Sequence, residues 1–155
     1  MINENYAIYP ARLKNIRIEY TDCAITGISF TDEPIGGNPT ELSEAASKQL
    51  NEYFLGMRTK FDLPLAPKGT PFQQKVWAAL LDIPFGQTRS YKDIAVVVGN
   101  ANASRAVGLA NNKNPIAIVI PCHRVIGTDR RLVGYAGGLD IKKALLDLEQ
   151  CIVGR

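Results

Sequence analysis

The chain has 155 residues, of which 46% are hydrophobic and 21% charged, and its formal net charge is +3. This composition is ordinary for a soluble globular protein and excludes a disordered tail, a collagen-like repeat and a coiled coil. A chain of this length buries enough surface to fold around a conventional core without disulfide bonds or a structural metal.

The N-terminal segment alternates polar and apolar residues and lacks the basic region and apolar stretch of a signal peptide. The longest apolar run, Ile116–Ile120, is too short to cross a bilayer. Three cysteines, Cys23, Cys122 and Cys151, do not suit a disulfide framework, and free thiols are typical of a reducing compartment. We therefore expect a cytoplasmic protein without membrane contact. Its single histidine, His123, is too few for a Cys/His zinc site.

The first part of the chain combines strands with one helix. Residues 16–20 and 24–30 alternate like β-strands around a turn, and residues 40–54 follow with helical periodicity. Two prolines and a glycine in residues 63–69 interrupt every periodicity, which predicts a domain boundary there. The sequence therefore predicts an α+β fold, with a small N-terminal domain over 1–65 and a mostly helical C-terminal domain over 66–155.

Charge differs between these two domains. Residues 1–65 carry six Lys and Arg against nine Asp and Glu, whereas residues 66–155 carry twelve against six. An excess of positive charge is the expected footprint of a polyanionic partner such as nucleic acid, although a solvated basic face gives the same count.

Three helices are predicted in the second domain. The first follows Thr70-Pro71, the second follows the capping pattern that begins at Ser90, and the third runs from Ala103 to about Asn111 with Asn102 as its cap. The second and third form a winged-helix-like helix-turn-helix pattern, in which the start of the later helix commonly meets DNA. Arg105 lies in that first turn. Helix pairs inside cores give the same pattern.

The chemistry of the chain concentrates in residues 114–125. Pro121 ends an apolar run, so we expect the Cys122 thiol at a rim, where His123 and Arg124 lower its pKa and make it nucleophilic. Neighbouring strand residues point to opposite faces, so His123 needs a turn or a bridging water to accept the thiol proton. A Cys-His hydrolase takes its histidine from a distant part of the chain, which argues against a protease. An inert buried cysteine beside a structural histidine stays an alternative.

Five linked motifs closely resemble the O6-alkylguanine-DNA alkyltransferases. They are Pro-Cys-His-Arg-Val at 121–125, Arg-Ala-Val-Gly at 105–108, Asn-Pro at 114–115, Tyr-Ala-Gly-Gly-Leu at 135–139, and Phe-Gly-Gln-Thr at 85–88 with Ser-Tyr at 90–91. The resemblance covers residues 70–150. The N-terminal part is similar only in size and in strand-helix order, from which the resemblance implies an RNase H-like domain.

The resemblance implies a repair protein that takes the alkyl group from O6 of guanine in double-stranded DNA, with O4 of thymine as a further candidate, and is inactivated by one transfer. It implies that Cys122 is the acceptor and that His123 relays the thiol proton through a water. Glu149 orients and charges His123, and Asn114 braces the active-site turn. The chemistry demands no cofactor and no metal, and we expect a monomer in solution.

The resemblance also implies how the damaged nucleotide is held outside the duplex, where extrusion costs a few kcal/mol. Tyr91 lies beside the flipped nucleotide, Arg105 fills the gap in the stack, and Tyr135 walls the pocket. Ala136 stands where many members have serine, which leaves its backbone amide as the donor. The other DNA-binding or base-binding residues implied are Ser104, Arg124, Val125 and Gly137.

Two further functions stay open on the residues. A lesion sensor on the same scaffold lacks the reactive cysteine, whereas Cys122 is present here. A helix-turn-helix regulator would use the basic half alone and gives no reason for the Pro-Cys-His-Arg segment.

Overall fold

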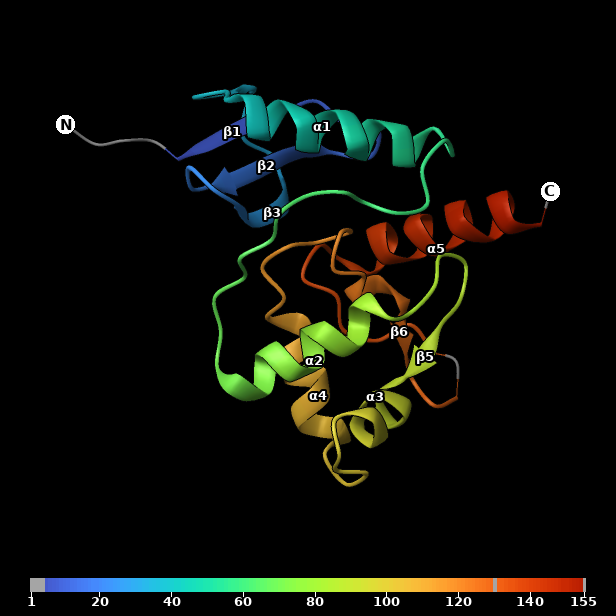
Figure 1. Ribbon diagram of the computed structural model, residues 1–155. Helices are drawn as coiled ribbons and strands as arrows, with labels where there is room; N and C mark the ends of the chain where they lie inside the picture. Colours follow the sequence, from blue (N-terminus) through green and yellow to red (C-terminus); the bar gives the residue numbers. More distant parts are fainter. Residues whose placement is uncertain (1–4, 130, 155) are drawn as a thin grey trace. The chain divides into compact units, whose positions relative to one another are not determined.

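The computed structural model describes residues 5–129 and 131–154. The chain divides after Pro67 into two compact units, which are taken separately below. Figure 1 shows a sheet with one helix in the first unit and a group of helices in the second. No helix in the described ranges is long and apolar enough to cross a membrane.

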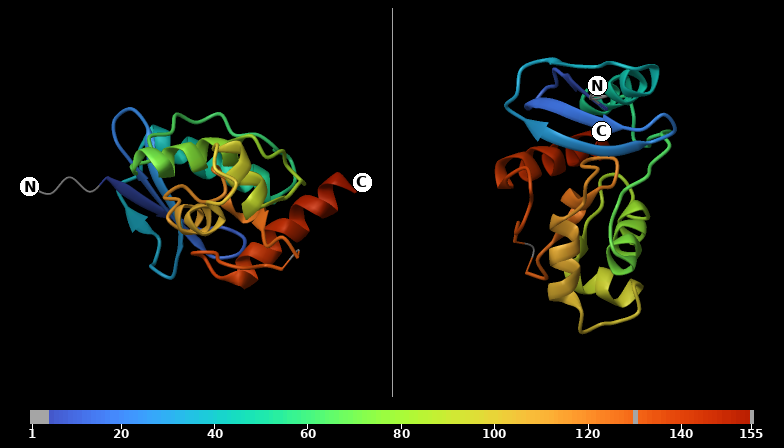
Figure 2. Two further views of the ribbon diagram at one scale, coloured as in Figure 1. Left: turned by 90° about the horizontal axis from the view of Figure 1, so that it is seen from below. Right: turned by 90° about the vertical axis from the view of Figure 1, so that its left-hand side faces the viewer.

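The first unit is an antiparallel sheet with a helix along one face (Figure 2). Its strands are β1 (Tyr6–Tyr9), β2 (Asn15–Tyr20), β3 (Ile25–Thr31) and β4 (Gly36–Gly37), in the spatial order β3-β2-β1-β4. Helix α1 (Glu41–Phe54) begins where Thr40 and Ser43 form a capping box, and it buries Ala46, Leu50 and Tyr53. The sequence predicted β2, β3 and α1 but missed β1, because four residues are too few for alternation to identify a strand.

The second unit is built around α2 (Pro71–Leu81), α3 (Tyr91–Val97) and α4 (Ser104–Asn112), which pack against one another. The predicted capping boxes at the starts of α2 and α3 are both present, since the side chains of Thr70 and Ser90 each accept from the backbone three residues on. Buried Trp77 joins α2 to α4, because its indole Nε1 donates to the Ala110 carbonyl at 2.9 Å.

The start of α4 differs from the prediction. Ala103 is the N-cap and no side chain caps the helix, whereas Asn102 was expected to do so. The side chain of Asn100 accepts from the Asn102 backbone instead, which holds Asn102 in the preceding turn. The helix-turn-helix arrangement itself is present, with Arg105 in the first turn of α4.

The segment before Cys122 is a turn, not the extended run that its apolar residues suggested. Residues 116–120 form no strand, and Ile118 has a φ of 72°, which is rare for a β-branched residue. A short 3-10 helix, η1 (Cys122–Arg124), follows, and then β6 (Val125–Ile126), which pairs in parallel with β5 (Arg89–Ser90). The compact turn therefore replaces the strand geometry in which Cys122 and His123 would face apart.

The last helix, α5 (Leu139–Val153), packs against η1. Its buried positions are Lys142, Leu145 and Glu149. The sequence predicts this helix at 140–149, with an inner face of apolar residues. The observed inner face is rotated from the predicted one and carries the charged side chains of Lys142 and Glu149.

Candidate active site

Cys122 is buried at the start of η1, with 6% of its surface exposed. The prediction of a thiol at a rim is therefore wrong, because the turn before Pro121 folds the segment inward. Burial raises the pKa of the thiol to about 11, and the side chain of Asn114 and the charge of Lys142 only partly offset this. The expected lowering of the Cys122 pKa in the resting protein is corrected: the thiol is neutral at pH 7.

Asn114 braces the turn that carries Cys122. Its Nδ2 donates to the carbonyl of Ile120 at 2.8 Å and to that of Ile116 at 3.3 Å. Its Oδ1 accepts from the Ile116 backbone at 3.0 Å. One side chain thus ties both ends of the turn, which agrees with the predicted bracing role.

His123 and Glu149 form a buried pair. The His123 Nε2 lies 2.6 Å from Glu149 Oε2, and both side chains are almost fully buried. An ionised carboxylate only accepts hydrogen bonds, so Nε2 carries the proton and Nδ1 has the free lone pair. Nδ1 is buried and has no hydrogen-bond partner in the described residues. Burial lowers the pKa of His123 and outweighs the raising effect of Glu149, so the ring is neutral and basic at Nδ1.

Among the described residues, Glu149 accepts hydrogen bonds from His123, Arg124 and Gly86. Besides His123, it accepts from Arg124 Nε at 2.8 Å, from Arg124 Nη2 at 3.1 Å and from the Gly86 backbone at 3.1 Å. Burial by itself would raise the pKa of Glu149, but the hydrogen bonds and charges of His123 and Arg124 lower it to about 2. The carboxylate is therefore ionised at pH 7.

Arg124 and Val125 do not offer their side chains to DNA, which corrects two predicted contacts. Arg124 is 6% exposed and its third nitrogen, Nη1, donates to the Ile83 carbonyl at 2.7 Å. Val125 is fully buried in the β5–β6 pair. The Glu149 carboxylate draws the Arg124 guanidinium inward, because a buried carboxylate needs a partner charge.

Lys142 is a buried charged residue near Cys122 that the sequence interpretation missed. Its side chain is fully buried, and Nζ donates to the carbonyls of Val125, Val133 and Gly134 at 2.6, 2.8 and 3.3 Å. Burial lowers its pKa to about 8, while an ionised Cys122 would raise it. The sequence feature that indicates its burial is its spacing, since Lys142 lies three residues before Leu145 and therefore on the same inner face of α5.

Two tyrosines lie near the thiol. The Tyr91 hydroxyl donates to the Val133 carbonyl at 2.8 Å. The Tyr135 hydroxyl is buried and has no partner among the residues that the structure describes. Burial raises the pKa of both, and a negative charge on Cys122 raises each further. Both tyrosines therefore lie close enough to Cys122 for its charge to affect them. Ala136 is exposed and Gly137 is half-buried in the turn that follows Tyr135.

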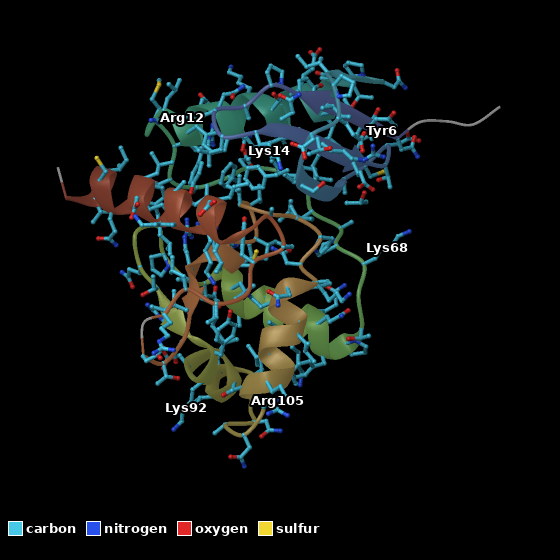
Figure 3. All side chains as sticks on the ribbon, turned by 180° about the vertical axis from the view of Figure 1, so that it is seen from behind. Tyr6, Arg12, Lys14, Lys68, Lys92 and Arg105 are labelled. Atoms are coloured by element: carbon cyan, nitrogen blue, oxygen red, sulfur yellow. The ribbon has the colours of Figure 1, made fainter. Side chains whose placement is uncertain are left out.

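Ser104 and Arg105 open α4 at the surface, Ser104 half-buried and Arg105 exposed. Figure 3 shows Arg105 and Lys92 at the same end of the second unit, with side chains directed outward. The Arg105 side chain is therefore a surface cation in the first turn of α4.

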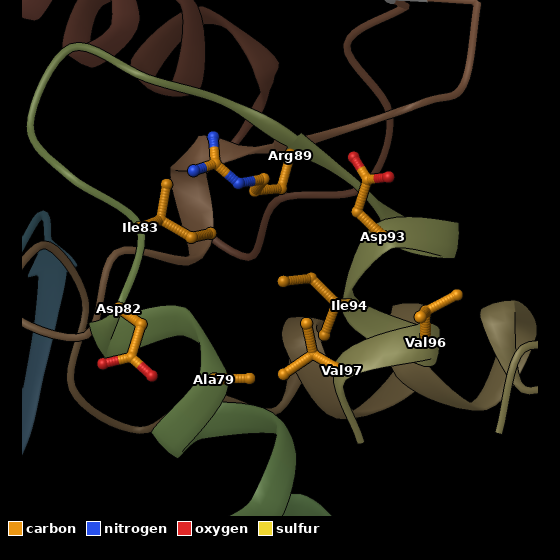
Figure 4. A pocket seen from close by; sticks show the side chains of 8 residues that line it. All are labelled: Ala79, Asp82, Ile83, Arg89, Asp93, Ile94, Val96 and Val97. Atoms are coloured by element: carbon orange, nitrogen blue, oxygen red, sulfur yellow. The ribbon is translucent and has the colours of Figure 1, made fainter. Parts of the chain in front are cut away.

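A pocket of about 610 Å³ lies between the end of α2 and α3 (Figure 4). It has an apolar floor with Asp82, Arg89 and Asp93 at its edges. None of the predicted site residues lines it, so it is separate from the Cys122 group. Within the described ranges, no group of three or more His, Cys, Asp or Glu could hold a metal ion.

Comparison with known proteins gives one consistent family. Residues 71–151 match the family described as 6-O-methylguanine DNA methyltransferase, DNA binding domain. A methylated-DNA–protein-cysteine methyltransferase of Methanosarcina barkeri is 64% identical over 105 residues, which are 68% of this chain and 66% of that protein, just under two thirds.

Solved structures extend the similarity to nearly the whole chain. The Mycobacterium tuberculosis O6-methylguanine methyltransferase is 42% identical with a TM-score of 0.87, over 95% of this chain and 93% of that one. The crystal structure of Mycobacterium tuberculosis OGT in complex with DNA gives 42% identity and a TM-score of 0.86, with coverages of 95% and 93%.

Proposed function

The chain belongs to the 6-O-methylguanine DNA methyltransferase family, and on that premise we propose that it repairs DNA by moving the alkyl group from O6 of guanine onto Cys122. O4 of thymine is a second atom from which the same displacement can occur. The observation that carries the assignment is the buried pair of His123 and Glu149, which leaves His123 Nδ1 as a base beside the cysteine.

The transfer is one displacement at carbon. The Cys122 sulfur forms a bond to the alkyl carbon while the bond from that carbon to O6 breaks, and the bonding electrons pass to the guanine, which takes up a proton from water. The thiol proton goes through a water to His123 Nδ1. A thioether is stable and the site holds nothing that removes it, so each chain reacts once.

The base is needed because the resting thiol is protonated. With a Cys122 pKa of about 11, only about one molecule in ten thousand carries the thiolate at pH 7. A neutral imidazole takes the proton as the new bond forms, and the resulting imidazolium lies against an ionised carboxylate. Glu149 therefore stabilises charge that appears only during the reaction, which is the kind of interaction that accelerates a step.

DNA binding is assigned to residues 66–155 through α3 and α4. We propose that Arg105 fills the gap left by the extruded nucleotide and that Ser104 contacts the backbone, since both open α4 at the surface. Tyr91, Tyr135, Ala136 and Gly137 surround the base once it enters. The base has to displace side chains that cover Cys122, and release of the Tyr91 hydroxyl from Val133 is one such movement.

The finer structural assignments belong to the same proposal. The α3–α4 pair supports a winged-helix-like domain, and the strand order with α1 supports an RNase H-like first unit. All residues of the reaction come from one chain, between Gly86 and Glu149, which supports a monomer. The free thiols of Cys23 and Cys151 are exposed, which suits the reducing cytoplasm.

The test is a mass measurement after mixing the protein with a duplex that contains O6-methylguanine. One methyl group should appear on the peptide that contains Cys122. Cys122→Ala should bind the duplex and take up none. The matched control replaces both exposed cysteines, Cys23→Ala with Cys151→Ala, and should react fully. Methyl uptake by Cys122→Ala would refute the acceptor assignment.

A further inference from the structure

The last turn of α4 reaches the reactive residue directly. The Asn111 Nδ2 donates to the carbonyl of Cys122 at 3.3 Å, and the Asn111 side chain is 1% exposed. Asn114, just beyond the helix, holds the carbonyl of Ile120. Two asparagine amides therefore hold the backbone on either side of Pro121: Asn111 binds the Cys122 carbonyl, whereas Asn114 binds the Ile120 carbonyl and lies against the Cys122 thiol.

Packing alone does not explain an asparagine at position 111. Its Oδ1 is buried and has no partner among the residues that the structure describes. A buried amide that leaves one of its polar atoms unpaired is less favourable for folding than a leucine of similar size, which has no polar group to desolvate. The retained polar group therefore indicates a role at the Cys122 carbonyl.

Helix α4 connects this contact to the DNA-binding surface. Its first turn carries Arg105 at the surface, and its middle is fixed by buried Val107 and by the Trp77 bond to Ala110. A helix of nine residues is about 13 Å long and does not bend easily over that length. The position of the helix on DNA is thus transmitted to the backbone of Cys122 through Asn111.

We propose that Asn111 is a positioning residue for the transfer: it fixes the Cys122 backbone to the DNA-binding helix, so that the sulfur keeps its orientation toward His123 and the entering base. This inference rests on the proposed function. It concerns the rate of the reaction after DNA has bound, because Asn111 is buried and touches no DNA-facing residue in the contacts described above.

The first test is Asn111→Leu in the full chain, with single-turnover transfer measured over a range of duplex concentrations. The rate at saturating duplex should fall about five- to tenfold, as for the loss of one hydrogen bond, while the duplex Kd stays unchanged. Reaction with free O6-methylguanine should slow by the same factor. A saturating rate equal to that of the wild type, or a loss confined to Kd, would overturn the proposal.

The second test is Asn111→Asp, which gives a readout that a structural defect does not. A protonated aspartic acid can donate to the Cys122 carbonyl, whereas the ionised form cannot. The rate relative to wild type should therefore decrease as pH rises through the titration of this carboxyl. A ratio that stays constant with pH would contradict the proposal, and this profile decides the question if Asn111→Leu does not fold.

The controls distinguish the role of Asn111 from the alkyl transfer itself. Asn112 is the exposed neighbour on the same helix, so Asn112→Leu and Asn112→Asp repeat both changes without the contact and should leave both readouts unchanged. If the wild type places no methyl on Cys122, the proposed function fails. If the wild type reacts and Asn111→Leu reacts equally fast, only the role of Asn111 fails.

Discussion

At the scale of single residues, Glu149 is the carboxylate that pairs with both His123 and Arg124. It is a buried carboxylate whose charge is balanced at rest by Arg124, while His123 is neutral. When His123 accepts the proton from Cys122, its ring becomes a second positive charge, on the other side of the same carboxylate. Arg124 occupies one side of the Glu149 carboxylate and holds it in place. Its positive charge also lowers the pKa of His123, so the ring stays neutral before the reaction.

Glu149→Gln should destabilise the protein by about 3–5 kcal/mol, since it leaves the buried Arg124 guanidinium without a counter-charge. It should also slow transfer. Urea unfolding measures the first effect and single-turnover kinetics the second. Asp147→Asn is the control on the same helix, because Asp147 is paired with Lys143 at the surface and should change stability by no more than about 0.5 kcal/mol.

The same carboxylate makes stability depend on acid pH. The pKa of Glu149 is lowered from 4.5 to about 2 in the folded protein, so its contribution is fully present above about pH 4.5 and is lost as pH falls toward 2. The difference amounts to about 3 kcal/mol. The difference in free energy of unfolding between wild type and Glu149→Gln should decrease as pH falls from 4.5 to 2. A difference that stays constant would contradict an ionised Glu149 carboxylate in the folded protein.

Lys142 also makes stability rise with pH, but in the alkaline range. Its pKa is lowered to about 8 in the folded protein from an ordinary 10.5, so between these values the unfolded chain binds one more proton and stability rises with pH. Below pH 8 its charge favours the Cys122 thiolate. Below pH 8, the charged Lys142 side chain therefore lowers the stability of the folded protein and increases the reactivity of Cys122.

Lys142→Met should react about tenfold more slowly than wild type at pH 7, because the pKa of Cys122 rises further without the nearby charge. The difference should shrink as pH passes 8, where wild-type Lys142 becomes neutral. Single-turnover rates from pH 6.5 to 9 check this. Lys143→Met, at an exposed position of the same helix, should show no such convergence, and a pH-independent difference would argue against the electrostatic role.

Among the elements, the turn between α4 and η1 decides where the thiol lies. Residues 116–120 are apolar and are buried for the most part, yet they form a turn whose Ile118 has a positive φ. Asn114 holds this conformation from both ends. A β-branched residue in the left-handed region stores about 1–3 kcal/mol of strain, which the burial of its side chain offsets.

At position 118 a glycine variant should be more stable than an alanine variant, which is the reverse of the usual order. Ile118→Ala and Ile118→Gly both remove a buried side chain and should lose about 2–5 kcal/mol. Only glycine relieves the positive φ, so Ile118→Gly should be more stable than Ile118→Ala by about 1 kcal/mol. Thermal unfolding of the two variants compares them. A more stable alanine variant would show that the turn carries no strain.

At the scale of the whole molecule, positive charge and the reactive group share the second unit. Residues 66–155 carry twelve basic residues against six acidic ones, and the described unit places Arg105 and Lys92 outward at one end (Figure 3). The Arg124 and Lys142 charges are buried instead, so the count of basic residues overstates the charge that can contact phosphate. Surface cations bind DNA with release of counterions, and affinity should decrease with salt.

Arg105→Ala should slow repair of duplex DNA by about tenfold or more while leaving reaction with free O6-methylguanine unchanged, since only the duplex needs a substitute for the extruded nucleotide. Single-turnover rates on the two substrates make the comparison. Lys92→Ala is the matched control, and it should change the salt dependence of binding without separating the two substrates. Equal losses on both substrates for Arg105→Ala would remove the proposed stacking role.

The sequence by itself determined the family, the reactive cysteine and most helix starts. Capping boxes at Thr70 and Ser90 are local hydrogen-bond patterns, and local patterns can be recognised without knowledge of the fold. The prediction of Asn102 as a cap is wrong, because the Asn100 side chain binds the Asn102 backbone and holds Asn102 in the turn before α4.

Only the tertiary structure decided where the charges of the site lie. The sequence interpretation placed Arg124 beside the thiol and on DNA and assigned no role to Lys142, yet both side chains are buried against carbonyls and a carboxylate supplied by distant parts of the chain. The burial of Cys122 and the side of His123 that stays basic follow from the same packing. A side chain's pKa depends on its desolvation and on the charges that face it across the fold, and neither quantity is encoded in the spacing of residues along a chain.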